Sequence, residues 1–316
     1  MTRAADALLA FALAGCAADA LVLTPTAATD AAGVVSFPTA GGVRRVDAGR
    51  FSVEAVPATI TGDLRFPPGS GPFPAIVLAH GCNGNRNTEN AWGPVLRSWG
   101  YATFVLDSFG GRGIDEVCTK PVLAPLQRVP DAYGALRLLA AHSRIDAKRV
   151  ALMGFSHGGS LTMLASTAWA KETFAGGGAA SFRAFFPFYP NCNAEFPERR
   201  PVSAPLRIHT GEADDWTPAG PCADLARSLK AAGQDASIDL YPGAHHAFDQ
   251  ARSHFRLPNV NNGSNCFPQM ASILGPFVAG SAPFSCVTKG ATVAGNAEAL
   301  SRARQKLRAQ LDELMK

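Results

Sequence analysis

One stretch decides the fold of this chain: Val150-Ala151-Leu152-Met153-Gly154-Phe155-Ser156-His157-Gly158-Gly159-Ser160. Its apolar beginning, residues 150–153, predicts a buried strand, and residues 161–165 follow with helical spacing. The Gly-x-Ser-x-Gly motif between them predicts a sharp turn that carries Ser156 as a nucleophile. Gly154 and Gly158 suit this turn because a Cβ would clash where strand and helix cross. The alternative is a glycine-rich helix start with Ser156 as its capping residue.

Composition narrows the class of protein. The chain has 316 residues, of which 47% are hydrophobic and 17% charged, which suits one large domain or two small ones. The net charge is +4 and the basic residues are scattered, so no nucleic-acid partner is expected. The chain has no run of 18 apolar residues, so no transmembrane helix is expected. The cysteines form no Cys-x-x-Cys pair, and we expect neither a metal nor a cofactor.

The first residues resemble an export signal. A short basic start precedes an apolar run at residues 7–14, and Leu13-Ala14-Gly15-Cys16 matches a bacterial lipobox. We therefore expect a signal peptide over residues 1–16, with lipidation at Cys16 as a candidate membrane tether and a plain cleavable signal as the alternative. Residues 17–50 have little periodicity and are interpreted as a tether. The domain then covers residues 51–316 of a periplasmic or envelope-anchored protein.

Six further cysteines support export. An even number of cysteines in an exported chain predicts disulfides, whereas six free buried thiols would suit a cytosolic enzyme. Counting alone allows fifteen connectivities. We expect pairing in chain order, because each consecutive pair flanks one loop expected near the active site. The candidates are Cys82, Cys118, Cys192, Cys222, Cys266 and Cys286.

Several predicted strands end at polar side chains. The apolar run at residues 75–79 ends at His80, and the following loop is expected to supply the backbone N–H of Cys82 to an oxyanion hole, together with that of His157. His80 itself is expected to hold this loop through a side-chain hydrogen bond. Strands near residues 206–210 and 238–241 lead to an acid and a histidine.

The acid and the histidine complete a candidate triad. Asp214 and His246 follow Ser156 by 58 and then 32 residues, which leaves room for a helix and a strand in each interval. The order Ser, Asp, His is that of α/β-hydrolases, whose site lies at the carboxyl edge of a mostly parallel sheet flanked by helices. Ser156 is then the nucleophile, His246 its base, and Asp214 the group that orients the imidazole. Asp215 and His245 are the neighbouring alternatives.

Three motifs together resemble the dienelactone hydrolase family. They are the Gly-x-Ser-x-Gly elbow, Gly211-x-x-Asp214, and Tyr241-Pro242-Gly243-Ala244-x-His246-Ala247-Phe248. The resemblance covers about residues 50–250 and implies an α/β-hydrolase fold, with Asp214 as the acid and His246 as the base. Namesake enzymes of the family carry Cys where this chain has Ser156, and an acid in the loop where it has His80-Gly81.

These departures favour a general serine esterase that cleaves small ester or lactone substrates through an acyl-enzyme. A peptidase of the same fold and a non-catalytic envelope binding protein are the alternatives.

Four expectations concern the surroundings of the site. Residues 51–66 alternate as an antiparallel hairpin. Asp107 is expected to pair with Arg112 and brace its loop, with substrate binding at this strand end as the alternative. Residues 248–290 form a long segment that is either a disulfide-tied flap or a surface excursion. Residues 297–314 carry the apolar stripe of a closing amphipathic helix.

Overall fold

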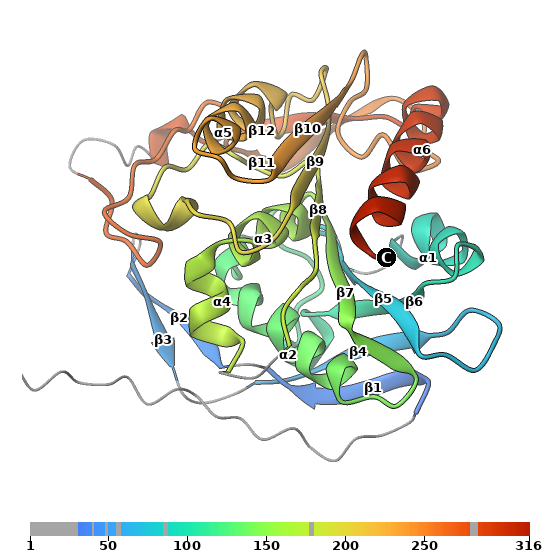
Figure 1. The fold of residues 1–316 in the computed structure, drawn as a ribbon. Helices are drawn as coiled ribbons and strands as arrows, with labels where there is room; N and C mark the ends of the chain where they lie inside the picture. Colours follow the sequence, from blue (N-terminus) through green and yellow to red (C-terminus); the bar gives the residue numbers. More distant parts are fainter. Residues whose placement is uncertain are drawn as a thin grey trace, which may run out of the picture.

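The fold is built on one eight-stranded sheet. The computed structural model describes residues 31–39, 41–47, 50–54, 58–84, 88–176, 180–278 and 284–316. The expected signal peptide, with Cys16, and the first part of the expected tether lie outside these residues. The strand order is β1-β4-β6-β5-β7-β8-β9-β10, and Figure 1 shows the sheet running through the centre of the molecule.

Six neighbouring strands of the sheet are parallel. They are β6 (Ala102–Asp107), β5 (Phe73–Ala79), β7 (Ile145–Phe155), β8 (Phe185–Phe188), β9 (Leu206–Gly211) and β10 (Ala236–Tyr241). The central strands are nearly continuous apolar runs because helices cover both of their faces. Two antiparallel strands, β4 (Thr59–Arg65) and β1 (Gly33–Pro38), extend the β6 edge.

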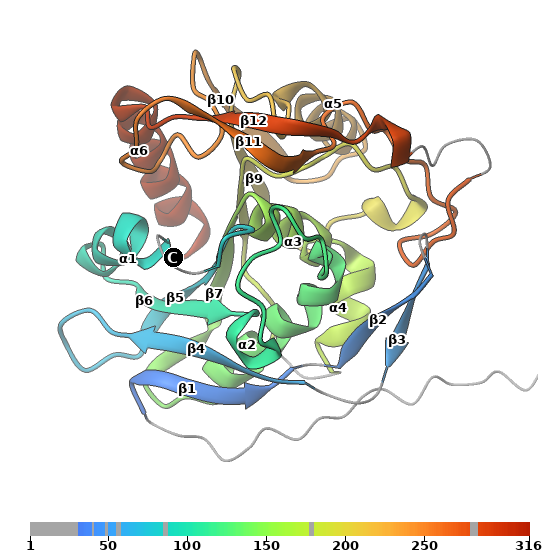
Figure 2. The same ribbon diagram turned by 180° about the vertical axis from the view of Figure 1, so that it is seen from behind.

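Helices pack on both faces of the sheet (Figures 1 and 2). One face carries α2 (Val129–Ala140), α3 (His157–Ala165), α4 (Ala168–Phe174) and α5 (Ala219–Ala231). The other carries α1 (Thr88–Ser98) and α6 (Ala297–Leu314). The expected closing helix is thus confirmed, with its apolar stripe buried. Among the described residues, no helix has both the length and the apolar character needed to cross a membrane.

Two expectations at the N-terminal side are wrong. β3 (Arg50–Glu54) pairs with β2 (Gly42–Asp47), whereas β4 joins the central sheet, so residues 51–66 are not one hairpin. Part of the expected tether is also structured, because β1 pairs with β4 and buries Phe37 against Phe104. One buried aromatic ring and a free sheet edge order a stretch whose own periodicity is weak.

The long segment after residue 248 contains a second small sheet. β11 (Phe255–Asn262) pairs with β12 (Thr288–Val293), and Val293 forms a bridge with His246. The segment therefore lies against the carboxyl edge of the central sheet, which favours a flap over a surface excursion (Figure 2). Four short 3₁₀ helices complete the described elements: η1 (Gly110–Arg112), η2 (Pro125–Arg128), η3 (Pro197–Arg199) and η4 (Phe284–Cys286).

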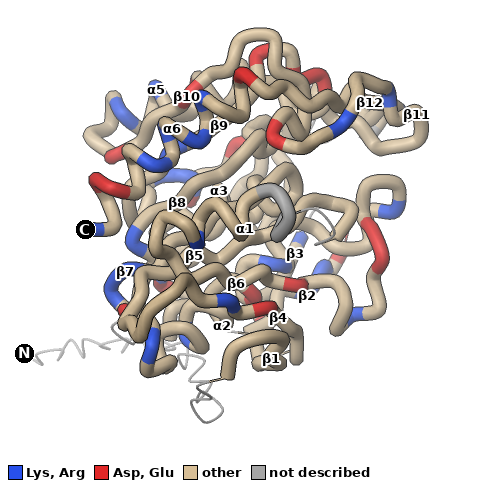
Figure 3. Tube along the Cα trace, turned by 90° about the vertical axis from the view of Figure 1, so that its right-hand side faces the viewer, with Lys and Arg blue, Asp and Glu red and all other residues tan. Residues whose placement is uncertain are grey.

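Three disulfides tie loops at this edge. The pairs are Cys82–Cys118, Cys192–Cys222 and Cys266–Cys286, which is pairing in chain order. Three such bonds indicate an oxidising, exported environment. Charged residues of both signs are interspersed along the trace in the view of Figure 3.

Candidate active site

Ser156 stands on the sharp turn between β7 and α3. Its backbone has φ of 54° and ψ of −114°, a conformation that non-glycine residues rarely adopt. A Cβ at Gly154 would overlap the carbonyl oxygen of Gly158, and a Cβ at Gly158 would overlap that of Ala79. The two glycines let helix and strands approach closely enough to hold the serine in this strained position.

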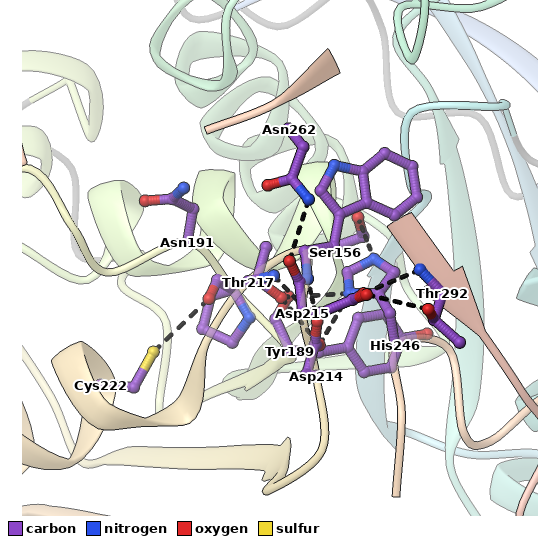
Figure 4. Close-up of polar contacts among 12 residues, drawn as sticks. Ser156, Tyr189, Asn191, Asp214, Asp215, Thr217, Cys222, His246, Asn262 and Thr292 are labelled. Carbon is purple, nitrogen blue, oxygen red and sulfur yellow. Dashed lines mark hydrogen bonds and ion pairs between the residues drawn. The ribbon is translucent and has the colours of Figure 1, made fainter. Parts of the chain in front are cut away.

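The structure brings Ser156, His246 and Asp214 into one chain of hydrogen bonds (Figure 4). The serine Oγ lies 2.8 Å from His246 Nε2, and His246 Nδ1 lies 2.8 Å from Asp214 Oδ2. The three residues follow β7, β10 and β9 respectively, at the carboxyl edge of the parallel strands. With its proton on Nδ1, the imidazole donates to the carboxylate and accepts from the hydroxyl, the arrangement needed to activate a serine.

Asp214 rather than Asp215 faces the histidine. Asp214 Oδ1 accepts the backbone N–H groups of Trp216 (2.9 Å) and Thr217 (2.8 Å), and Thr217 Oγ1 lies 2.9 Å from Oδ2. Asp215 turns instead to β12, where it accepts the backbone N–H and the hydroxyl of Thr292 at 2.7 and 2.8 Å. One acidic residue therefore belongs to the hydrogen-bond chain, and its neighbour attaches the second sheet to the same loop.

The other histidine of the pair points elsewhere. The ring of His245 lies 5.0 Å from that of His254, centroid to centroid, outside the hydrogen-bond chain. His246 is 2% exposed and packs against the rings of Tyr189 and Trp216, at centroid distances of 4.8 and 4.7 Å. This packing leaves the imidazole little freedom to leave its position.

A buried network that the sequence analysis missed supports the histidine loop. Asp249 accepts a hydrogen bond from the hydroxyl of Tyr189 and another from Trp92 Nε1, both at 2.7 Å. Burial raises the pKa of Asp249, and burial raises that of Tyr189 as well. No local pattern marks these residues, because the partners of Asp249 lie 60 and 157 residues away along the chain. Thr217 was also missed, although its place three residues after Asp214 is a local signal for a side-chain-capped turn.

The two residues expected to form an oxyanion hole flank the nucleophile. Cys82 and His157 line the same cavity as Ser156. A Cβ on Gly81 would lie 3.6 Å from Cβ of Ser156, so the Gly81–Cys82 backbone passes beside the nucleophile. Cys82 is held by its disulfide to Cys118 and by a hydrogen bond of 2.7 Å from the backbone of Val117 to its carbonyl oxygen.

The loops behind the oxyanion residues differ in part from expectation. His80 is buried and its Nδ1 lies 2.8 Å from the carbonyl oxygen of Gly81, the loop contact expected of it. The prediction that Asp107 pairs with Arg112 is wrong. Asp107 accepts backbone N–H groups of its own loop, and Arg112 makes two 2.8 Å hydrogen bonds to Asp131. Tertiary packing brings the carboxylate of Asp131, on α2, within hydrogen-bond distance of the Arg112 guanidinium, although Asp107 is nearer to Arg112 in sequence.

A cavity of about 420 Å³ opens beside Ser156. Its lining is largely apolar, with side chains from α3, α5, the segment after β8 and the segment around residue 273. Examples are Met163, Leu164, Phe196, Leu225, Leu229 and Ile273. The lining also includes Arg199, whose guanidinium donates to the carbonyl oxygens of Cys192 and Ala194 and to Glu195. The cavity therefore suits an uncharged apolar group.

The dienelactone hydrolase family model matches residues 60–264, more than half of the sequence. The chain belongs to the dienelactone hydrolase family. It has the α/β-hydrolase fold, as the solved dienelactone hydrolase-like structures do.

Comparison with individual proteins agrees with this family. A protein of Bradyrhizobium sp. described as a probable 2-oxo-3-(5-oxofuran-2-ylidene)propanoate lactonase is 26% identical over 135 residues, 40% of this chain and 49% of the relative. The acylamino-acid-releasing enzyme of Rattus norvegicus is 25% identical over 223 residues, 59% of this chain and 30% of the relative. The chain thus matches half or less of the length of these relatives.

A solved structure shows the same fold. A dienelactone hydrolase-like promiscuous phosphotriesterase from metagenomic libraries superposes with a TM-score of 0.55 at 16% identity, covering 90% of this chain and 100% of the other.

Proposed function

We propose that this dienelactone hydrolase family member cleaves carboxylic esters or lactones through a Ser156–His246–Asp214 triad and an acyl-enzyme. One observation carries the proposal: the unbroken series of 2.8 Å contacts from the hydroxyl of Ser156, which lines an apolar cavity, through His246 to Asp214. A free serine hydroxyl is a weak nucleophile, and a base held at this distance supplies the missing activation.

The proposed first half-reaction forms the acyl-enzyme. His246 Nε2 takes the hydroxyl proton while Ser156 Oγ bonds to the ester carbonyl carbon. The carbonyl oxygen becomes negative, and the backbone N–H groups of Cys82 and His157 stabilise it. The carbon–oxygen bond to the alcohol then breaks, and His246 returns the proton to the departing alkoxide.

The second half-reaction uses the same groups with water. His246 takes a proton from a water molecule while the water oxygen attacks the acyl carbon. The bond between the acyl carbon and Ser156 Oγ then breaks, and His246 returns the proton to Oγ. His246 keeps its Nδ1 proton throughout, and Asp214, which accepts the hydrogen bond from it, stabilises the imidazolium in both steps. The products are a carboxylic acid and an alcohol, or one hydroxy acid from a lactone.

The cavity favours uncharged acyl groups. Its charged side chain, Arg199, is 6% exposed and already bonded to two carbonyl oxygens and a carboxylate. An anionic lactone such as the propanoate named for the Bradyrhizobium relative would find no free cation among the described lining residues. We therefore expect better turnover of short neutral esters.

A peptidase activity is the second candidate. The match to acylamino-acid-releasing enzymes supports it, although it covers 30% of those proteins. For the same acyl group, the two activities share the acyl-enzyme and the second half-reaction, and they differ in the leaving group of the first. A panel that pairs p-nitrophenyl esters with acyl-amino acid p-nitroanilides of the same acyl group separates them.

Ser156→Ala tests the function directly. We expect a loss of at least about 10⁴-fold in kcat on p-nitrophenyl butyrate, because the nucleophile is gone while the cavity remains. Ser98→Ala, an exposed serine on α1, serves as the matched control. A fluorophosphonate probe should label the parent protein at Ser156 and leave the variant unlabelled. Activity of the variant within about tenfold of the parent would exclude Ser156 as the nucleophile. A parent protein with neither labelling nor ester hydrolysis would instead favour a non-catalytic binding protein.

We also propose that the protein reaches the cell envelope through a leader over residues 1–16, with Cys16 as the lipidated residue. The three disulfides support export. Incorporation of labelled palmitate into the full chain, absent from Cys16→Ala, is the expected result. Unlabelled protein recovered free in the periplasm would instead indicate a plain cleavable signal.

A further inference from the structure

Arg128 is a buried cation behind the proposed oxyanion hole. It has no exposed surface and lies at the end of η2, directly before α2. Its Nη1 donates to the carbonyl oxygen of His80 at 3.1 Å and to Nδ1 of His157 at 2.8 Å. His80 begins the Gly81–Cys82 loop, and His157 directly follows the nucleophile. One guanidinium therefore holds both segments whose N–H groups would bind the oxyanion.

The positive charge of Arg128 is poorly balanced. The carboxylates that act on it most strongly belong to Asp131 and Asp107. Asp131 is occupied by two hydrogen bonds from Arg112, and Asp107 by backbone N–H groups. Within the described part of the chain, Nε and Nη2 of Arg128 have no hydrogen-bond partner, and the ring of Phe109 lies 5.0 Å away.

Such an arrangement costs stability. Burial lowers the pKa of Arg128 to about 9, so the group still carries its charge at neutral pH. A buried charge without a paired counter-charge opposes folding, and a buried polar group without a partner requires a reason. The oxyanion that forms only during the reaction provides such a reason. Its negative charge would be stabilised by the positive potential of Arg128, which no paired carboxylate among the described residues balances in the resting protein.

His157 links Arg128 to the site without moving a proton. Its Nε2 donates to the carbonyl oxygen of Leu123 at 3.0 Å, and its Nδ1 accepts from Arg128. Burial and the neighbouring guanidinium lower the pKa of His157 to about 3, so the ring stays neutral. An imidazole fixed at both nitrogens keeps the first residue of α3, and with it the backbone N–H of His157, in one orientation.

We propose that Arg128 is a positioning residue for the oxyanion hole, which orients the Cys82 and His157 N–H groups and supplies a positive potential that favours the negative tetrahedral intermediate. This inference rests on the proposed esterase mechanism. Donors and charges that are fixed before the reaction stabilise a developing charge without reorganising, so the effect belongs to the transition state rather than to substrate binding.

Arg128→Met tests the proposal, because it keeps much of the side-chain volume and removes charge and donors. Arg128→Lys keeps the charge. Arg137→Met is the matched control on the following helix, α2, where Arg137 donates to the carbonyl oxygens of Phe174 and Thr39. For each variant we would measure kcat and KM on p-nitrophenyl butyrate. We would also measure the inhibition constants of an alkyl trifluoromethyl ketone, which forms an oxyanion adduct with serine, and of the matching methyl ketone.

The expected result is a selective loss. Arg128→Met should lower kcat and trifluoromethyl ketone affinity by the same factor, about 10- to 100-fold, somewhat less than removal of a direct oxyanion donor. KM and methyl ketone affinity should stay within about twofold, and Arg128→Lys should recover most of the loss. Arg137→Met should match the parent in kcat.

Other outcomes overturn the proposal. Equal loss of affinity for both ketones would show a structural role, and unchanged kcat in a folded Arg128→Met protein would show no role. If that variant does not fold, Arg128→Gln takes its place against Arg128→Lys with the same criteria. If neither neutral variant folds, Arg128→Lys decides by whether its losses of kcat and trifluoromethyl ketone affinity are equal. Activity that survives Ser156→Ala would instead remove the mechanism itself, so the two failures are distinguishable.

Discussion

Asp214→Asn is the sharpest test of the triad, because the structure fixes which way the new amide would point. Two backbone N–H groups, those of Trp216 and Thr217, point at Oδ1 of Asp214. The amide oxygen must stay there to accept them, which places the amide nitrogen at the position of Oδ2. That nitrogen would donate to Nδ1 of His246, 2.8 Å away.

This donation reverses the tautomer of the histidine. With Nδ1 accepting, the imidazole proton moves to Nε2, which then donates to Ser156 Oγ and cannot take its proton. An exchange that reverses the tautomer in this way costs about 10⁴-fold in kcat, or about 5 kcal/mol of transition-state stabilisation. The serine, the cavity and the oxyanion donors are unchanged, so KM should stay close to that of the parent.

Asp215→Asn provides the control within the same loop. The Asp215 side chain is 43% exposed and contacts Thr292 and Arg256 rather than the histidine. We expect kcat within about threefold of the parent, since no reacting group is displaced. Initial rates on p-nitrophenyl butyrate across pH 6 to 9 would measure both variants. Asp214→Asn with activity within tenfold of the parent, or two equally inactive variants, would refute the assignment.

Two further predictions concern disulfides and pH. Replacing Cys82 and Cys118 by Ala should lower the free energy of unfolding by about 4 kcal/mol, for a separation of 36 residues, and should also lower kcat. Replacing Cys266 and Cys286, separated by 20 residues, should lower the free energy of unfolding by about 3 kcal/mol and leave kcat nearly unchanged. Urea unfolding measures the first quantity, and initial rates measure the second. Burial lowers the pKa of His209 to about 4, so unfolding takes up a proton between about pH 6.5 and 4, and stability falls by about 1.4 kcal/mol per pH unit as the pH drops through this window. Urea unfolding of His209→Gln at pH 7, 6 and 5 should show a shallower slope, and equal slopes would contradict the assignment of the shift.

The candidate site shows how function arises from the end of a sheet. The elbow and the acid loop follow β7 and β9, whose carboxyl ends are buried, and the histidine loop follows the edge strand β10 that pairs with β9. Buried hydrogen bonds of Asp249 hold the histidine loop, and disulfides hold neighbouring segments at residues 82 and 192. This combination fixes the distances of 2.8 Å that the proposed chemistry requires.

The sequence alone determined what depends on neighbours along the chain. Apolar runs marked the central strands, and the spacing of Gly154, Ser156 and Gly158 marked the elbow, because a tight turn excludes large side chains locally. The ends of the strands placed a serine, an acid and a histidine at one edge. The stripe of the closing helix was equally legible, since its period is a local property.

The tertiary structure decided everything that depends on residues far apart in sequence. It determined that Asp214 bonds to His246 while Asp215 bonds to Thr292, and that Arg112 bonds to Asp131 rather than to Asp107. It also placed Arg128 against His80 and His157. In each case the sequence offers more than one chemically equivalent partner. Only the packing of strands and helices in space determines which of them comes within hydrogen-bond distance, and which buried charge is left without a partner.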